Sequence, residues 1–204
     1  MNDNKKFWDR CSFAYTRLQE KSNQKSYDLI VEKCQSYVDN KEVLELACGT
    51  GQFSFGLAKH AKKYLATDYS SKMVEQAIKR NNSEIIFETA DATDLKYQDE
   101  SFDVVIIANA LHIMPCPDLA LAEIKRVLKK DGILITPNFI YDCKYNHFRI
   151  WLLERLGFKT FNKWTSIEFV DFVEEQGFKL IKKEVVLATP LAELLAIYEK
   201  RPLW

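Results

Sequence analysis

Val43 to Ser54 reads VLELACGTGQFS, and the rest of the chain is interpreted around this stretch. An apolar run that contains Glu45 is followed by Gly49 and Gly51 and then by apolar residues at helical spacing. Because glycine lacks Cβ, it permits a sharp bend and lets a ligand approach the main chain closely. Ordinary turns also use spaced glycines, so the stretch alone predicts a strand, a tight turn and the start of a helix, whose free N–H groups favour anions.

The length and composition are typical of one globular domain. The chain has 204 residues, of which 47% are hydrophobic and 28% charged, enough to bury a substantial core. Basic and acidic residues number 29 each, so no net positive charge attracts phosphates, and nucleic acid is not expected as a partner. No apolar run reaches the roughly 18 to 20 residues of a membrane span, and residues 1–10 do not resemble a signal peptide. We therefore expect a cytoplasmic protein with no integral membrane segment.

The five cysteines are scattered along the chain and form no C-x-x-C pair: Cys11, Cys34, Cys48, Cys116 and Cys143. An odd number of unpaired positions argues against a disulfide framework and against a zinc site. We therefore predict that most of the cysteines are reduced, structural thiols and that no metal is bound.

Strands and helices are predicted to alternate through the first two thirds of the chain. The expected strands are 43–47, 64–67, 85–88, 102–108 and 133–136. The fourth is an almost unbroken aliphatic run, as expected for a strand buried on both faces of a parallel sheet. The alternation predicts an α/β sandwich, with ligands at the carboxyl ends of the strands.

The two ends of the chain carry helical and strand patterns of their own. Residues 1–40 hold two amphipathic helical patterns separated by the polar segment 20–25; the first, with Trp8, is either a packed helix or a lid over a site. Near the other end, a capping box predicts a helix over 167–176. Two strands, 178–188 and 193–200, follow it.

Asp68 ends the second strand, 17 residues beyond Gly51. This is close to the spacing at which an acidic residue meets ribose hydroxyls in nucleotide-binding units, and a carboxylate can accept from both hydroxyls. The alternative is a helix cap, because Asp68, Ser70 and Ser71 precede a helical pattern. We favour the ligand role for Asp68, with Ser70 or Ser71 as the cap.

Five motifs in unbroken order resemble those of the class I S-adenosylmethionine-dependent methyltransferases, and more narrowly the small-molecule branch with the ubiquinone and menaquinone biosynthesis enzymes. They are ELACGTG (45–51), ATDYSSKMVEQA (66–77), ADATDL (90–95), SFDVVIIANALHIM (101–114) and LAEIKRVLKKDGILI (121–135). One departure is Ala47, where many members have glycine. Dinucleotide dehydrogenases are the natural alternative, but their third glycine falls at Ser54 here.

The resemblance implies a Rossmann-like three-layer α/β sandwich with a seven-stranded, mostly parallel sheet whose last strand is antiparallel. It also implies a single methyltransferase domain over 1–204. The domain would comprise an N-terminal helical lid (1–40), a cofactor-binding core (41–138), an aromatic substrate-side insertion (139–164) and a closing helix and strand pair (165–204).

The resemblance further implies S-adenosyl-L-methionine as the cofactor. Asp68 would accept from both ribose hydroxyls, Asp91 from the adenine amine, and Asn109 would lie beside the reacting methyl group. Met73 would lie against the adenine, and the Ala92 N–H would donate to its ring. The full set of expected cofactor-binding residues is Glu45, Ala47, Gly49, Gly51, Asp68, Met73, Asp91, Ala92 and Asn109.

Such a site needs little from the protein besides alignment and exclusion of water, because the sulfonium already activates the methyl group. A general base helps only where the acceptor carries a proton that must leave. His112 is the best-placed candidate by motif position, although a structural hydrogen-bonding role stays open. Tyr15 is a second, weaker candidate.

The acceptor is expected to be recognised outside the shared motifs. Residues 139–164 are dense in aromatic side chains, partly as a packed helix and partly as candidates for an apolar or aromatic pocket. Tyr141, His147 and Trp151 are the candidate substrate residues. The predicted function is methyl transfer to a small-molecule acceptor. The alternatives are methylation of a lipid or membrane-held quinone, and a noncatalytic cofactor-binding regulatory partner; the oligomeric state is not predicted.

Overall fold

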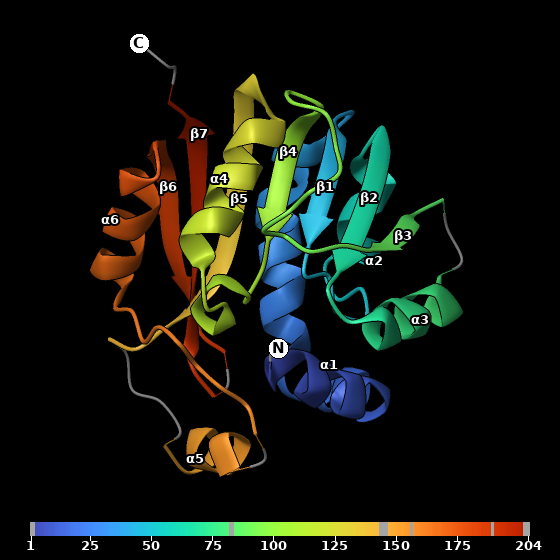
Figure 1. The fold of residues 1–204 in the computed structure, drawn as a ribbon, viewed down its shortest axis with the longest axis vertical. Coiled ribbons are helices and arrows are strands. Elements are labelled where there is room, and N and C mark those ends of the chain that lie inside the picture. Colours follow the sequence, from blue (N-terminus) through green and yellow to red (C-terminus); the bar gives the residue numbers. More distant parts are fainter. Residues whose placement is uncertain (1–2, 82–83, 143–146, 156, 189, 202–204) are drawn as a thin grey trace.

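Across residues 3–81, 84–142, 147–155, 157–188 and 190–201, which the computed structural model describes, one seven-stranded sheet has helices on both faces (Figure 1). The strand order is β3-β2-β1-β4-β5-β7-β6. The strands are β1 (Glu42–Leu46), β2 (Lys63–Asp68), β3 (Ile86–Thr89), β4 (Phe102–Ile107), β5 (Leu128–Ile140), β6 (Phe178–Val186) and β7 (Ala192–Lys200).

The sheet is parallel from β3 to β5, and β7 runs antiparallel to both of its neighbours, β5 and β6. The predicted seven-stranded, mostly parallel sheet with an antiparallel last strand is thereby confirmed. β1 lies between β2 and β4, with Leu44 beside Leu65 on one side and Val105 on the other. The chain order reverses at β1, which is the position where open α/β sheets bind ligands at the carboxyl ends of their strands.

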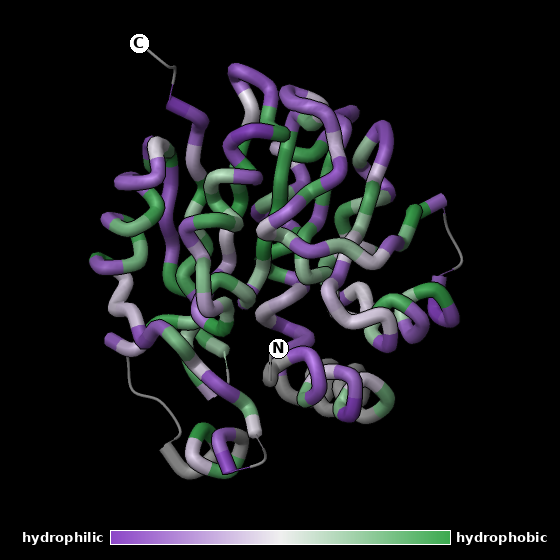
Figure 2. Tube along the Cα trace, in the orientation of Figure 1, coloured by the Kyte–Doolittle hydropathy of each residue, from purple (hydrophilic) through white to green (hydrophobic). Residues whose placement is uncertain are grey.

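Two apolar clusters fill the two faces of the sheet and make the three layers. On one face, α4 (Pro117–Val127) and α6 (Ser166–Glu175) bury side chains such as Leu121 and Phe169. On the other face, the later part of α1 (Asp3–Val38) buries Ile30 and Val38. Figure 2 shows hydrophobic residues along the central strands and hydrophilic residues on the outer turns of the helices.

The prediction of two N-terminal helices is wrong, because α1 is continuous through the polar segment 20–25. That segment contains neither glycine nor proline, and its lysine, glutamate and glutamine residues are good helix formers, so polarity alone did not end the helix. Figure 1 shows the early part of α1 below the carboxyl ends of the strands and its later part behind the sheet.

The helix after the glycine loop is shorter than the sequence suggests. α2 (Ser54–Leu57) passes at once into a 3-10 turn, η1 (Ala58–His60). The reason is the register of the sheet: Lys63 already pairs with Glu42, so few residues remain for a helix before β2 begins.

The helices α3 (Ser71–Arg80) and α5 (His147–Arg155) lie where the sequence has helical patterns. The short 3-10 turn η2 (Leu111–Ile113), which follows β4, was not predicted. The capping box before α6 is confirmed, since the Thr165 side chain accepts from the Glu168 N–H and the Glu168 side chain accepts from the Thr165 N–H. No helix of the described residues is long and apolar enough to cross a membrane. Four cysteines are free thiols, Cys11, Cys34, Cys48 and Cys116, while Cys143 lies outside the described residues.

Gly51→Ala is expected to lower the free energy of unfolding by roughly 2 kcal/mol. Gly51 has φ +91°, and an added Cβ would lie 2.6 Å from Cε2 of Phe55, so both the backbone and the packing resist the change. Urea unfolding followed by circular dichroism measures the loss. Gly157→Ala is the matched control, because its φ is +97° but the nearest atom to its Cβ is Nη2 of Arg10 at 3.5 Å. Equal losses in the two variants would show that the contact with Phe55 contributes nothing.

Candidate active site

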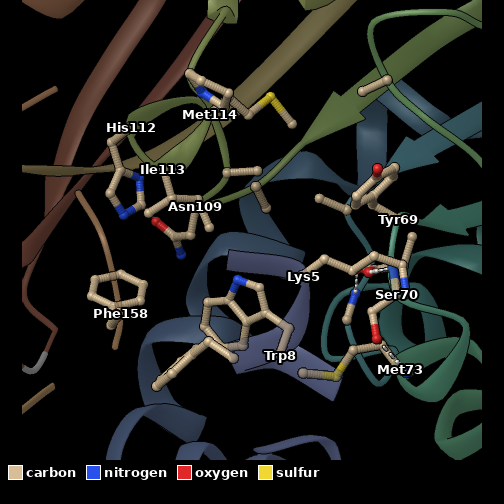
Figure 3. A pocket seen from close by; sticks show the side chains of 18 of the residues that line it. Lys5, Trp8, Tyr69, Ser70, Met73, Asn109, His112, Ile113, Met114 and Phe158 are labelled. Atoms are coloured by element: carbon tan, nitrogen blue, oxygen red, sulfur yellow. Dashed lines mark hydrogen bonds between the residues drawn. The ribbon is translucent and has the colours of Figure 1, made fainter. Parts of the chain in front are cut away.

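A cavity of about 500 Å³ lies between the carboxyl ends of the strands and the early part of α1 (Figure 3). This volume is within the range of small-molecule sites. The cavity brings together nine of the residues expected from the sequence: Ala47, Gly49, Asp68, Met73, Asp91, Ala92, Asn109, His112 and Tyr141.

Asp68 joins the glycine loop to the end of β2. Its Oδ2 accepts from the Gly49 N–H at 2.8 Å, and its Oδ1 accepts from the Ser70 N–H at 2.8 Å. Burial raises the pKa of Asp68 to about 6, against the opposing effect of these two hydrogen bonds. The carboxylate is therefore held in a fixed orientation at the cavity wall.

Ser70 caps α3, as predicted, and also ties α1 to the site. Its Oγ accepts from the Met73 N–H at 3.2 Å and donates to Asp9 Oδ1 at 2.5 Å. Asp9 is further bound to Lys5 at 2.9 Å, and both Lys5 and the neighbouring Trp8 belong to the early part of α1. Since Lys5 and Trp8 line the cavity, this part of α1 forms one of its walls.

Glu45 and Gly51 do not line the cavity. The Glu45 side chain is 1% exposed, and its Oε2 accepts from Ser54 Oγ at 2.5 Å and from the Tyr64 hydroxyl at 2.9 Å. Burial raises its pKa to about 7. Glu45 thus fastens β1 to α2 and β2 from behind the loop, and Gly51 closes the turn through an N–H bond to the Cys48 carbonyl.

Asp91 and Ala92 line the cavity after β3. Asp91 Oδ1 accepts from the Thr93 N–H at 2.9 Å and from Thr93 Oγ1 at 2.7 Å, a turn that uses one carboxylate oxygen. The Asp91 side chain is exposed, so its other oxygen can accept from a ligand amine.

Asn109 follows β4 in a left-handed conformation with φ +51°. Its N–H donates to the Pro137 carbonyl at 2.7 Å, and its side-chain Nδ2 donates to Glu193 Oε2 at 2.9 Å. Sequence reasoning missed Glu193. The signal was available, because Glu193 is the one charged residue in the otherwise apolar stretch 190–198.

His112 is buried beside the cavity as a neutral base. Its Nδ1 lies 3.2 Å from Asn138 Oδ1, and Asn138 Nδ2 donates to the Phe139 carbonyl at 3.0 Å, so Oδ1 is the atom that faces the ring. Nδ1 therefore carries the proton and Nε2 has a free lone pair. Burial lowers the pKa of His112 to about 4, against the opposing effect of Asn138.

His112 is expected to stay neutral between pH 8 and pH 5. Proton NMR of the ring, assigned by comparison with His112→Gln, should then show no titration step near pH 6.5, because the folded pKa is about 4. The unfolded chain takes up this proton first, so His112 should lower the stability of the fold as pH falls from about 6.5 to 4. A midpoint near 6.5 in the folded protein would contradict this assignment.

Aromatic side chains line the cavity on the side of α1. The ring centroids of Phe7, Trp8 and Phe158 lie between 5.0 and 5.8 Å apart, and Phe139 packs edge-on against His112 at 5.6 Å. Tyr141 also lines the cavity. The wall thus joins α1, the end of β5 and the segment after α5, which lie far apart in the sequence.

Comparison with known proteins agrees with this geometry. A family described as a methyltransferase domain matches residues 44–136. A demethylmenaquinone methyltransferase of Clavibacter sepedonicus is 34% identical over 137 residues, which are 65% of this chain and 56% of that protein. An uncharacterized protein of Methanocaldococcus jannaschii is 30% identical over 161 residues, which are 78% of this chain and 75% of that protein. The chain belongs to the class I S-adenosylmethionine-dependent methyltransferases.

The fold of this methyltransferase is shared by solved structures. The methyltransferase in complex with the Haloferax volcanii Trm112 methyltransferase activator superposes with a TM-score of 0.81, over 94% of this chain and 95% of that one, at 17% identity. A likeness at this identity shows the fold alone. The chain spans about half the length of its Clavibacter relative, 56%.

S-adenosyl-L-methionine is the cofactor of this family, and the residues of the cavity are suited to it. Asp68 offers carboxylate oxygens to hydroxyls, and Met73 offers an apolar surface to a base. Asn109 Oδ1 is buried and has no hydrogen-bond partner among the described residues, so one acceptor of this cavity-lining residue is unsatisfied. These features fit a ligand with a ribose, a base and an N–H-bearing end.

Besides Glu45 and Gly51, three further residues expected at the methyltransferase site are not placed there by the structure. Trp151 lies outside the cavity, with its side chain 52% exposed and the Arg155 guanidinium 5.5 Å from its ring centroid. The neighbouring Ile150 lines the cavity instead, because successive residues of a helix face directions about 100° apart. The side chains of Tyr15 and His147 lie outside the described part of the chain.

Proposed function

We propose that this protein transfers the methyl group of S-adenosyl-L-methionine to a small-molecule acceptor with an apolar or aromatic body. The observation that carries the proposal is one cavity shared by the cofactor-type residues Gly49 and Asp68, the neutral His112, and an aromatic wall that includes Trp8 and Phe158. Small-molecule sites are characteristically apolar with a few placed polar groups, and this cavity has that composition.

When bound, the cofactor supplies a methyl group that its sulfonium has already activated. The residues of this chain hold the two reactants and exclude water. Asp68 orients the ribose, while Trp8 and Phe158 align the acceptor against their faces. His112 is neutral above about pH 4 and is a weak base, so its Nε2 accepts a hydrogen bond from an acceptor O–H or N–H and takes up the proton only as the methyl group is transferred.

A turnover assay tests the proposal. The protein is incubated with S-adenosylmethionine and a panel of phenols, catechols, quinols and aromatic amines, and S-adenosylhomocysteine is quantified together with methylated product. We expect turnover of an aromatic acceptor and a loss of about 100-fold or more in kcat for His112→Gln when the acceptor carries a proton. Binding of S-adenosylhomocysteine without turnover of any acceptor would favour the noncatalytic, regulatory alternative.

A second candidate acceptor is a membrane-held quinone. The Clavibacter relative is named a demethylmenaquinone methyltransferase. Phe13 on α1 and Trp151 and Leu152 on α5 are exposed by 86%, 52% and 43%. The early part of α1 and the whole of α5 lie at the end of the molecule beyond the carboxyl ends of the strands (Figure 1). Large exposed apolar side chains near a cavity suit an apolar substrate delivered from a lipid surface.

Vesicle cosedimentation separates the two candidates. The quinone proposal expects the wild type to sediment with lipid vesicles and the double variant Phe13→Ser, Trp151→Ser to stay in the supernatant with unchanged cofactor binding. A wild type that stays in the supernatant favours a freely dissolved acceptor. A cytoplasmic location remains part of the proposal in either case.

A further inference from the structure

Glu193 is a buried carboxylate at the start of β7. Its side chain is 0% exposed, and no salt bridge reaches it among the described residues. Oε2 accepts from Asn109 Nδ2 at 2.9 Å, and Oε1 has no hydrogen-bond partner within the described chain. Burial raises its pKa to about 7, against the opposing effect of Asn109. A buried acidic side chain is costly, so its single contact calls for an explanation.

The backbone of Asn109 is fixed, so only its amide group can turn. Its left-handed φ of +51° and the N–H bond to the Pro137 carbonyl hold it between β4 and β5. The Asn109 side chain lines the cavity and faces it between His112 and Trp8 in Figure 3. Which end of the amide a ligand meets therefore depends on what holds the other end.

Glu193 determines which end of the Asn109 amide is held and which end is left for a ligand. A carboxylate oxygen that accepts a hydrogen bond can hold only the Nδ2 end of the amide, and Oε2 keeps this capacity whether or not Oε1 carries a proton. With Nδ2 held, Asn109 Oδ1 is left as the free end, and it is buried without a partner among the described residues. The amide end without a hydrogen bond among the described residues is therefore the acceptor Oδ1 and not the donor Nδ2.

We propose that Glu193 is a positioning residue, which holds the Asn109 amide so that Oδ1 accepts a hydrogen bond from the bound ligand. The inference rests on the proposed function, because the ligand is the cofactor or the acceptor of that site. The ligand group that Asn109 Oδ1 recognises is an N–H or O–H donor. Its source is either the ammonium group of the cofactor's amino acid part or the proton-bearing group of the acceptor.

The experiment compares Glu193→Met with Glu193→Gln. Methionine keeps the volume but offers no comparable acceptor, so the amide can turn and present Nδ2 to the ligand; glutamine keeps an oxygen for Nδ2. Glu199→Gln is the matched control, since Glu199 lies on the same strand and its exposed carboxylate pairs with Lys179 at 2.8 Å. Each variant is titrated calorimetrically with S-adenosylhomocysteine and with 5′-methylthioadenosine, which lacks the amino acid part.

If the cofactor's ammonium is the donor, Glu193→Met weakens S-adenosylhomocysteine binding by about 10- to 100-fold, leaves 5′-methylthioadenosine binding unchanged, and Glu193→Gln restores most of the loss. If the acceptor is the donor, both titrations stay unchanged, and Glu193→Met raises the acceptor KM by about 10-fold with rescue by glutamine. Equal weakening of both ligands, or no effect on either ligand or on KM, overturns the inference. Failure of the wild type to bind S-adenosylhomocysteine would instead refute the proposed function.

Discussion

Asp68→Ala is expected to weaken binding of S-adenosylhomocysteine by about 100- to 10,000-fold. Two ribose hydroxyls donating to one carboxylate each contribute about 1.5 to 3 kcal/mol, because hydrogen bonds to a charged group are stronger than neutral ones. The substitution also releases the N–H groups of Gly49 and Ser70, which Asp68 now fixes. Isothermal titration calorimetry measures the change, with NADH as the comparison ligand.

Asp94→Ala is the control for this prediction, since Asp94 is an exposed carboxylate paired with Lys96 and does not line the cavity. A pH series adds a second readout. Because the pKa of Asp68 is raised to about 6, wild-type affinity should fall as pH drops through about 6, whereas Asp68→Ala should lack this component. Affinity in Asp68→Ala within threefold of the wild type would contradict the role, and tight binding of NADH would favour a dinucleotide site.

The positions of most strands were predictable because burial leaves a direct record in the sequence, whereas the seven-stranded layout with an antiparallel last strand was expected from the family resemblance. The apolar run of β4 could hardly be anything but a strand buried on both faces. Asp68 and Asn109 follow directly after strands, and parallel strands bring their carboxyl ends to one edge, so residues far apart in sequence were correctly expected to meet there.

The bounds that depend on tertiary pairing were not predictable. β5 extends from Leu128 to Ile140, well beyond the expected 133–136, because β7 pairs with it along Ile133 to Ile140 and Leu128 pairs with Phe102 of β4. Local sequence carries no record of these partners. The wrong prediction for α1 has a different cause, because the polar middle of this helix consists of residues that allow a helix, and polarity alone does not mark an interruption.

The site residues that were missed share one property, since their placement depends on geometry between elements. Glu193 reaches Asn109 only because the antiparallel β7 enters the sheet beside β5, with Glu193 opposite Phe139. Ile150, and not Trp151, lines the cavity because of the rotation of α5 about its own axis. An aromatic-rich segment shows that a pocket is plausible, but its periodicity does not say which face meets it.

Glu45→Gln is expected to remove a pH-dependent loss of stability of about 3 kcal/mol. The pKa of Glu45 is raised by burial from 4.5 to about 7, so between these values the folded chain holds a proton that the unfolded chain has released. The wild type therefore loses stability as pH rises from about 4.5 to 7. Glutamine does not titrate, and its oxygen can still accept from Ser54 and Tyr64 as Glu45 does now.

Urea unfolding of the wild type and Glu45→Gln at pH 5 and pH 8 measures this difference. As pH rises, the free energy of unfolding of the variant should increase relative to that of the wild type. Glu42→Gln, on the same strand, is the control of opposite sign, because a hydrogen bond from Lys129 lowers the pKa of Glu42 and its stabilising effect is lost as pH falls. Parallel pH profiles for the wild type and Glu45→Gln would show that Glu45 is already ionised at pH 5. The buried carboxylate would then fasten the glycine loop as an anion held by Ser54 and Tyr64, and the loop would keep one electrostatic state throughout the physiological range.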